Sequence, residues 1–145
     1  MAFRFSLATL LRMREIAEQR EEQLLGQILN QMAHTRQALA DLDTQRKNLI
    51  TNRELALQAT TSSVDLQGFY THMDLIDELE RSGKEQLAKL GTLRDQQMKT
   101  YEAAHRDRQL LSDMRKEKHE DFQREQTRKE QNLMDDNFSA RRSSY

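Results

Sequence analysis

The sequence predicts an all-α protein: a long antiparallel two-helix coiled-coil hairpin with a C-terminal helical overhang. Apolar residues recur in alternating steps of three and four along two separate stretches, which is the spacing of a coiled-coil seam. The chain of 145 residues contains no proline, so nothing in it forces a break in a long helix. A short run of small polar residues separates the two stretches and predicts the bend of the hairpin.

The first stretch predicts a helix over residues 6–58, with Ser6 as its N-cap. Arg46 and Arg53 occupy seam positions, and we expect their stems to cross the seam while their charged ends reach water or acids. Gly26 lies beside the seam and is interpreted as a tolerated defect that costs about 1 kcal/mol relative to Ala, with a close contact as the alternative. The seam itself consists of Leu25, Ile28, Met32, Thr35, Leu39, Leu42, Leu49 and Ala56.

Residues 59–64 predict the turn, and the second helix is expected over residues 65–137, capped by Ser63 or Asp65. A flexible tail, residues 138–145, is expected to follow, so that residues 1–145 form a single hairpin domain. The second seam consists of Phe69, Met73, Ile76, Leu87, Leu90, Tyr101, Ala104, Leu111 and Phe122, with Glu80, Gly83, Arg94, Gln97, Arg108 and Arg115 in the same columns.

The tip of the hairpin is the most aromatic and apolar part of the chain, although a tip should be the least buried part. Two interpretations stay open: the tip folds back as a short helix, with a kink at Gly68, or it is a docking surface. The residues of that docking surface would be Phe69, Tyr70, Met73 and Ile76.

The position of the turn also predicts the register, because antiparallel partners should have residue numbers that sum to about 124. Arg46 is then expected near Asp77, Glu78 and Glu80, Arg108 near Glu15 and Glu18, and Leu111 and Met114 beside Leu10, Leu11 and Met13. Residues beyond about 120 have no partner in this register. This overhang carries Leu133, Met134 and Phe138 near one face, and it is either a frayed tail or a helix that another protein completes.

Composition excludes several classes of function. With 23 basic and 24 acidic residues and only 6% aromatic ones, the chain suits a solvated helix pair better than an enclosed active site. The absence of cysteine excludes disulfides and thiolate metal sites and fits the cytoplasm. No apolar run approaches the roughly 20 residues that span a bilayer, and a net charge of −1 gives no general attraction to nucleic acid. We therefore expect no direct membrane insertion and no nucleic-acid partner.

Individual motifs add no catalytic chemistry. Glu102 and His105 have the Glu-x-x-His spacing of di-iron bundles, but the motif occurs once and a two-helix coil has no interior for it. No glycine-rich phosphate loop is present, and the basic residues of the C-terminal part alternate with acids, as on a surface that contacts protein. The basic, apolar residues 1–14 are interpreted as the start of the mature helix, with a membrane anchor or transit peptide as the alternative. We expect no enzyme activity, metal or cofactor.

Two terminal stretches, FRFSLATLLRMR at residues 3–14 and RKEQNLMDD at residues 128–136, resemble the flagellar FliJ family, the small coiled-coil protein of the flagellar type III export apparatus. Residues 3–14, FRFSLATLLRMR, are similar to the family's F-x-F-x-L-x-x-L-L-x-x-R start. Residues 128–136, RKEQNLMDD, are similar to its C-terminal part, and the tip, residues 66–73, LQGFYTHM, agrees more loosely.

The resemblance implies a non-enzymatic, central-stalk-like protein that inserts in and stimulates the hexameric export ATPase and couples it to the export gate and to substrate chaperones. It implies a cytoplasmic location, peripheral to the inner membrane at the flagellar base. The tip would then bind the gate. The end that enters the ATPase would comprise Phe5, Leu7, Leu10, Leu11, Arg14, Arg128, Leu133, Met134, Phe138 and Arg141. A structural scaffold and a substrate-binding export chaperone are the alternative functions.

Overall fold

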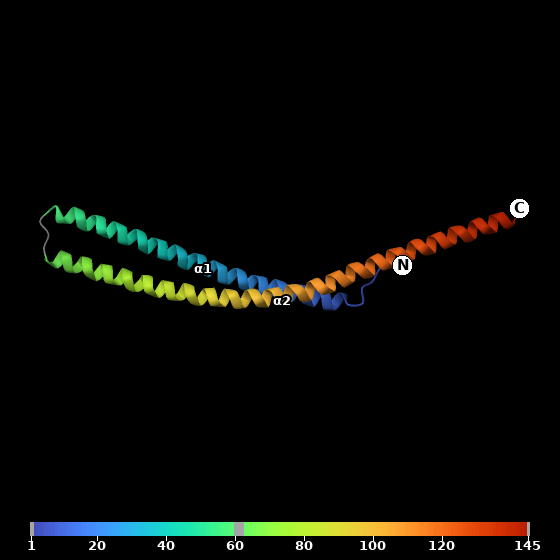
Figure 1. Cartoon of the computed structure of the whole chain (residues 1–145), viewed down its shortest axis with the longest axis horizontal. Helices are drawn as coiled ribbons and strands as arrows, with labels where there is room; N and C mark the ends of the chain where they lie inside the picture. The colour runs from blue at the N-terminus through green and yellow to red at the C-terminus, as the bar shows by residue number, and fades with distance from the viewer. Residues whose placement is uncertain (1, 60–62, 145) are drawn as a thin grey trace. The chain divides into compact units, whose positions relative to one another are not determined.

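The computed structural model describes residues 2–59 and 63–144, and these form two α-helices and no strand. Helix α1 spans Ala8–Leu57 and helix α2 spans Ser63–Ser143 (Figure 1). Contacts group the chain into two units, which are described separately. We call residues 22–100 the hairpin unit, and residues 1–21 together with 101–145 the terminal unit.

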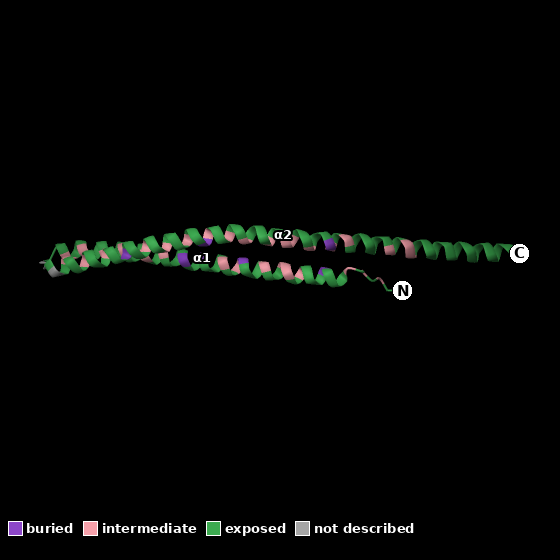
Figure 2. Ribbon diagram, turned by 90° about the horizontal axis from the view of Figure 1, so that it is seen from below, coloured by how far each residue is buried: buried purple, intermediate pink, exposed green. Residues whose placement is uncertain are grey.

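In the hairpin unit, α1 and α2 run side by side in opposite directions (Figures 1 and 2). The predicted 3-4 seam forms its core, because residues in these two columns point at the facing helix. Among the core residues, Ile76 is 1% exposed and Met32 is 3% exposed. The fold class predicted from the two apolar stretches is therefore confirmed. Buried with them are Leu25, Thr35 and Leu90.

Gly83 lets the two helices approach closely in this unit. A Cβ atom built on Gly83 would lie 2.8 Å from Cδ2 of Leu39, which is shorter than real contacts allow. Gly26, in contrast, has nothing within 4 Å of such a Cβ, in agreement with its interpretation as a tolerated defect. Gly68 has nothing within 4 Å either, and α2 is helical through it. The alternative of a separate short helix at the tip is therefore wrong.

In the terminal unit, a non-helical segment, residues 2–7, precedes α1 and packs on α2. Its side chains alternate between half-buried and exposed, with Phe3, Phe5 and Leu7 on the covered side. The Phe3 ring stacks on His119 with 4.9 Å between centroids and lies 5.6 Å from Phe122. A turn over residues 6–7, in which the Ala8 amide donates to the Phe5 carbonyl at 3.1 Å, precedes α1, which begins at Ala8 instead of near residue 6. Ser6 is consequently not its N-cap, and the Leu11 amide makes the first α-type bond, to the Leu7 carbonyl.

Contacting pairs in both units follow the predicted register. The ion pairs of Arg46 with Asp77, of Arg14 with Asp107 and of Glu18 with Arg108 join residues whose numbers sum to between 121 and 126. Helix α2 continues to Ser143, past the expected end near residue 137. Residues 127–144 are exposed throughout, as the C-terminal end in Figure 2 shows. We call residues 127–143 the overhang.

Candidate partner-binding surfaces

The overhang exposes large apolar side chains on a regular helix. Leu133 is 62% exposed, Met134 is 69% exposed and Phe138 is 68% exposed. The seam columns of the paired part, continued into the overhang, hold Lys129, Asn132, Asp136 and Ser139, which are polar. The overhang is therefore not a continuation of the same two-stranded seam, and its apolar residues are available to a different partner.

The basic residues proposed beside these side chains lie in the same exposed segment. The Arg128 guanidinium contacts Glu125 at 2.8 Å, one helical turn away, and its side chain is 68% exposed. Arg141 and Arg142 lie in the last turn of α2, where a positive charge also interacts favourably with the helix dipole. Local pairs of this kind are weak, so a partner's acids can compete for these guanidinium groups.

The N-terminal residues proposed for the same end fall into two groups. Leu11 is a core residue, 5% exposed, so it does not belong to a docking surface in this structure. Leu10 is 38% exposed, and the Arg14 guanidinium lies 3.4 Å from the Asp107 carboxylate. Phe5 and Leu7 are half-buried in the segment that packs on α2. This segment was not anticipated, although the alternation of apolar and polar residues from position 3 to position 7 is a signal for extended backbone.

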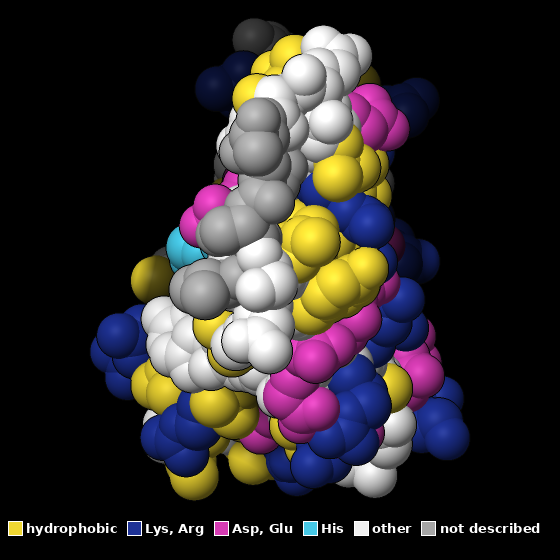
Figure 3. Space-filling view, turned by 90° about the vertical axis from the view of Figure 1, so that its left-hand side faces the viewer, with side chains coloured by type: hydrophobic (Ala, Val, Ile, Leu, Met, Phe, Trp, Pro, Cys, Tyr) yellow, Lys and Arg dark blue, Asp and Glu magenta, His cyan; other side chains and the backbone are white. Residues whose placement is uncertain are grey.

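At the tip, the aromatic side chains are engaged within the hairpin unit. The Arg53 guanidinium lies 4.8 Å from the centre of the Phe69 ring, and its Nη2 donates to the Tyr70 hydroxyl at 3.2 Å. A pocket of about 270 Å³ opens beside Phe69. Met73 is half-buried and Tyr70 is 53% exposed. Ile76 is in the core and does not belong to this surface. Seen from the loop end, hydrophobic side chains form a patch that borders acidic and basic ones (Figure 3).

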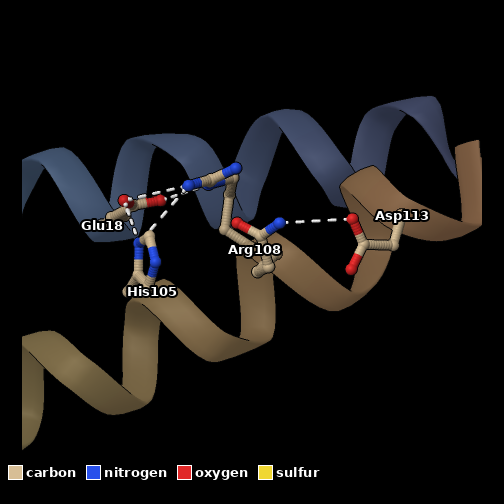
Figure 4. Close-up of polar contacts among 5 residues, drawn as sticks. Glu18, His105, Arg108 and Asp113 are labelled. Atoms are coloured by element: carbon tan, nitrogen blue, oxygen red, sulfur yellow. Dashed lines mark hydrogen bonds and ion pairs between the residues drawn. The ribbon is translucent and has the colours of Figure 1, made fainter. Parts of the chain in front are cut away.

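A polar cluster crosses the helix pair in the terminal unit. Glu18 of α1 and His105 and Arg108 of α2 point toward one another (Figure 4). Arg108 donates from Nε to Glu18 Oε2 at 2.5 Å, and His105 Nδ1 lies 2.9 Å from Oε1. A carboxylate only accepts, so its bond to His105 requires a proton on Nδ1, whereas Arg108 Nη2, 3.3 Å from the same nitrogen, can only donate to it. The hydrogen bond from Arg108, assisted by His105 and opposed by burial, lowers the pKa of Glu18.

A second polar cluster has the same form in the hairpin unit. Arg46 of α1 pairs with Asp77 at 2.5 Å and also with Glu80, which accepts from Lys84 at 2.8 Å. The hydrogen bond from Lys84 and the charge of Arg46 lower the pKa of Glu80. Arg46 and Arg108 therefore meet acids across the seam as predicted, whereas Arg53 contacts the rings of Phe69 and Tyr70. Such pairs determine register more than they add stability.

Neither cluster has the composition of a metal site. In the described part of the chain, no group of three or more His, Cys, Asp or Glu side chains is arranged to hold a metal ion. Likewise, no described helix has an apolar stretch that is long enough to cross a membrane. The surfaces that distinguish this molecule are those suited to contacts with other proteins.

Together, the helix pair and the exposed helical end define an antiparallel coiled-coil hairpin protein. The family model described as "Flagellar FliJ protein" matches residues 3–144. The chain belongs to the flagellar FliJ family and is a component of the flagellar export apparatus. This family consists of structural export components and is not a family of enzymes. No curated protein and no solved structure shows significant similarity to the chain.

Proposed function

We propose that this protein is a stalk-like component of the export apparatus that inserts its overhang into the hexameric export ATPase and stimulates ATP hydrolysis. Its place would be the cytoplasmic side of the inner membrane at the flagellar base. The same chain would couple the ATPase to the export gate through the tip and would contact substrate chaperones. Membership in the FliJ family supports this assignment at the level of the apparatus.

The exposure of the overhang is the observation that carries the ATPase part of the proposal. Burying Leu133, Met134 or Phe138 in a partner would contribute about 1.5–3 kcal/mol each. An isolated helix of this length is marginally stable in water, so enclosure by a ring would also stabilise the helix itself. An apolar helical end that the rest of the chain leaves uncovered is what insertion into a ring requires.

The charges of the overhang fit the same interpretation. Arg128, Arg141 and Arg142 could pair with acidic side chains that line a ring. Such pairs would contribute orientation and association rate more than affinity, because they start from well-solvated groups. Acidic residues lie between these arginines along the overhang. The overhang would therefore attract only a surface on which acidic and basic groups alternate in a complementary way.

The tip supports the gate part of the proposal less directly. The tip presents the aromatic rings of Phe69 and Tyr70 and the thioether of Met73 beside a pocket. It lies at the end of the hairpin unit where α1 ends. Aromatic and Met side chains are enriched in protein interfaces, where they supply large contact areas. Binding at the tip would have to preserve or replace the contacts of Arg53 with the two rings.

The test is ATP hydrolysis by the cognate hexameric ATPase, titrated with the full-length chain and with a chain that ends after Gln126. The shortened chain keeps Phe122 and its contact with Phe3, so the paired part should retain its helicity and melting temperature. We expect loss of the stimulation with the shortened chain and partial loss with Leu133→Ala and with Phe138→Ala. Full stimulation by the shortened chain would contradict insertion of the overhang.

The same preparations separate the two alternative functions. A structural scaffold would form assemblies that grow with concentration, which light scattering would detect, and would leave the ATPase rate unchanged. A substrate-binding chaperone would bind secreted subunits tightly and would also leave that rate unchanged.

A further inference from the structure

The two sides of the hairpin unit differ sharply in charge. On one side, two rows of residues lie directly before seam residues. The row on α1 precedes Leu25, Met32, Leu39, Arg46 and Arg53, and the row on α2 precedes Met73, Glu80, Leu87, Arg94 and Tyr101. We call the ten residues of these two rows the uncharged flank, because none is Asp, Glu, Lys or Arg. All ten are exposed. They are Leu24, Gln31, Ala38, Gln45 and Asn52 of α1, and His72, Leu79, Gln86, Leu93 and Thr100 of α2.

The other side of the same helix pair is highly charged. The residues that follow each seam residue there include nine charged side chains, and several of them form the pairs already described, such as Asp77 with Arg46. The charged residues on this side are Arg36, Asp43, Lys47 and Glu54 of α1, and Asp74, Asp77, Arg81, Lys84 and Asp95 of α2. The unit therefore carries many charges beside the seam on one side and none in the uncharged flank on the other.

A groove confirms that the two rows of the uncharged flank lie on the same side. Its volume is about 550 Å³, and Ala38 and Gln45 of α1 line it together with Leu79 and Gln86 of α2. The floor includes Leu39 and Gly83, a pair at which the helices approach closely. Asp41 also lines the groove, and its carboxylate accepts a hydrogen bond from Gln37 at 3.0 Å. The pocket at the tip includes Asn52 and His72, so it borders the same flank.

The lack of charge on this flank is not explained by the hairpin itself. In a coiled coil, the positions beside the seam normally carry Lys and Glu, which pair across the helices and keep the surface soluble. Depletion of charged residues is instead the compositional mark of the centre of a protein–protein interface. Leu79 and Leu93, which are 47% and 49% exposed, add apolar area to this flank.

We propose that the uncharged flank is the docking surface for one helix of another protein, with an uncharged contact face of apolar residues at spacings of three and four. A groove between two helices accepts the side-chain ridge of a third. A highly charged contact face would lose its water with little compensation, because the flank carries no charge and Asp41 is the one charged residue among the described residues that line the groove. Four heptads of flank correspond to about 42 Å, so the partner helix would have about 25–30 residues.

A second copy of this chain would present the same uncharged face, so the mass of the crosslinked adduct distinguishes it from a helix of another protein. The proposal concerns the hairpin unit and does not depend on insertion of the overhang into the ATPase.

The experiment is site-specific photo-crosslinking in the bacterium that makes this protein, at native expression. The crosslinking amino acid p-benzoylphenylalanine replaces Gln45 or Gln86 on the uncharged flank, and Asp43 or Ala88 on the charged side. We expect adducts from the flank positions alone, and mass spectrometry should map them to a helix whose contact face is uncharged. Adducts of twice the chain mass, equal yields from both sides, a charged contact face or no adduct would overturn the proposal.

A matched pair of charge variants tests the surface directly. Ala38→Glu with Gln86→Glu places charges on the uncharged flank, whereas Ala40→Glu with Ala88→Glu makes a comparable change on the charged side. All four positions are exposed and helical. The first variant should lower the crosslink yield from Gln45 about tenfold, and the second should change it less than twofold. If the first variant melts at a lower temperature, the single change Gln86→Lys provides the same test, and an unchanged yield in the folded variant would overturn the proposal.

Discussion

The tip of the hairpin unit and the overhang of the terminal unit both carry aromatic and aliphatic side chains at the surface, but these side chains differ in what they contact. At the tip, Phe69 and Tyr70 hold the Arg53 guanidinium between the helices. In the overhang, Leu133 and Phe138 are more than half exposed. Apolar content alone therefore does not identify a docking surface. The deciding property is whether other residues of the chain already contact the apolar side chains.

The largest expected difference in the free energy of unfolding is between alanine variants of two leucines of α2, one buried and one exposed. Leu111 is 7% exposed, and Leu111→Ala should lower the free energy of unfolding by about 2–5 kcal/mol, because it removes packed atoms and leaves a cavity. Leu133→Ala should change it by no more than about 0.5 kcal/mol. Urea unfolding followed by circular dichroism measures both. Similar losses for the two variants would mean that the overhang folds back onto the helix pair.

Substitutions at the tip should cause an intermediate loss of stability, because its aromatic rings have partners within the chain. Replacing Phe69 and Tyr70 by Ala removes the ring contacts of Arg53 and should lower stability by about 1–3 kcal/mol. If the tip binds the gate, ATPase stimulation should stay near normal while export and motility fall. Thermal unfolding, ATP hydrolysis and a motility assay on the same variant separate these effects. Equal loss of stimulation and motility would assign the tip a purely structural role.

A smaller effect is expected where Glu18 meets Arg108 and His105 in the terminal unit. The pKa of Glu18 is lowered, so this carboxylate stabilises the fold above its ordinary pKa of about 4.3, and the stabilisation is lost as the pH falls through the folded value. Glu18→Gln should cost about 1 kcal/mol at pH 7 and should flatten the loss of stability on acidification. Melting temperatures from pH 7 to pH 3 test this, and an unchanged acid dependence in the variant would assign it to other carboxylates.

The smallest effects are expected at two glycines that differ in what surrounds them. Gly26 has open space where an added methyl group would lie, so Gly26→Ala should raise stability by about 0.5–1 kcal/mol through helix propensity. Gly83→Ala would place its Cβ against Leu39, so the displaced leucine should offset that gain. Chemical unfolding of the two variants gives the comparison. Equal stabilisation would show that the Leu39 side chain moves aside without cost.

Most of the fold and part of the candidate sites could be predicted from the sequence. The seam spacing predicted both helices, and the position of the turn predicted the register that joins Arg46 to Asp77 and Arg108 to Glu18. The N-terminus was not predicted correctly, because Phe3, Phe5 and Leu7 suit an amphipathic helix as well as an extended segment. The contact of Phe3 with His119 and Phe122, which lie more than a hundred positions away in the chain, favours the non-helical form.

The sequence by itself determined the helical class, the antiparallel pairing and the overhang, because these depend on periodicity and on the number of residues on either side of the turn. Only the tertiary structure decided which apolar side chains are free. Ile76 and Leu11 are buried, whereas Leu79 and Leu133 are exposed. All four are aliphatic residues on long helices, and the facing helix alone distinguishes them. The uncharged flank became visible for the same reason, since two separate rows of residues form one surface only after pairing places them side by side.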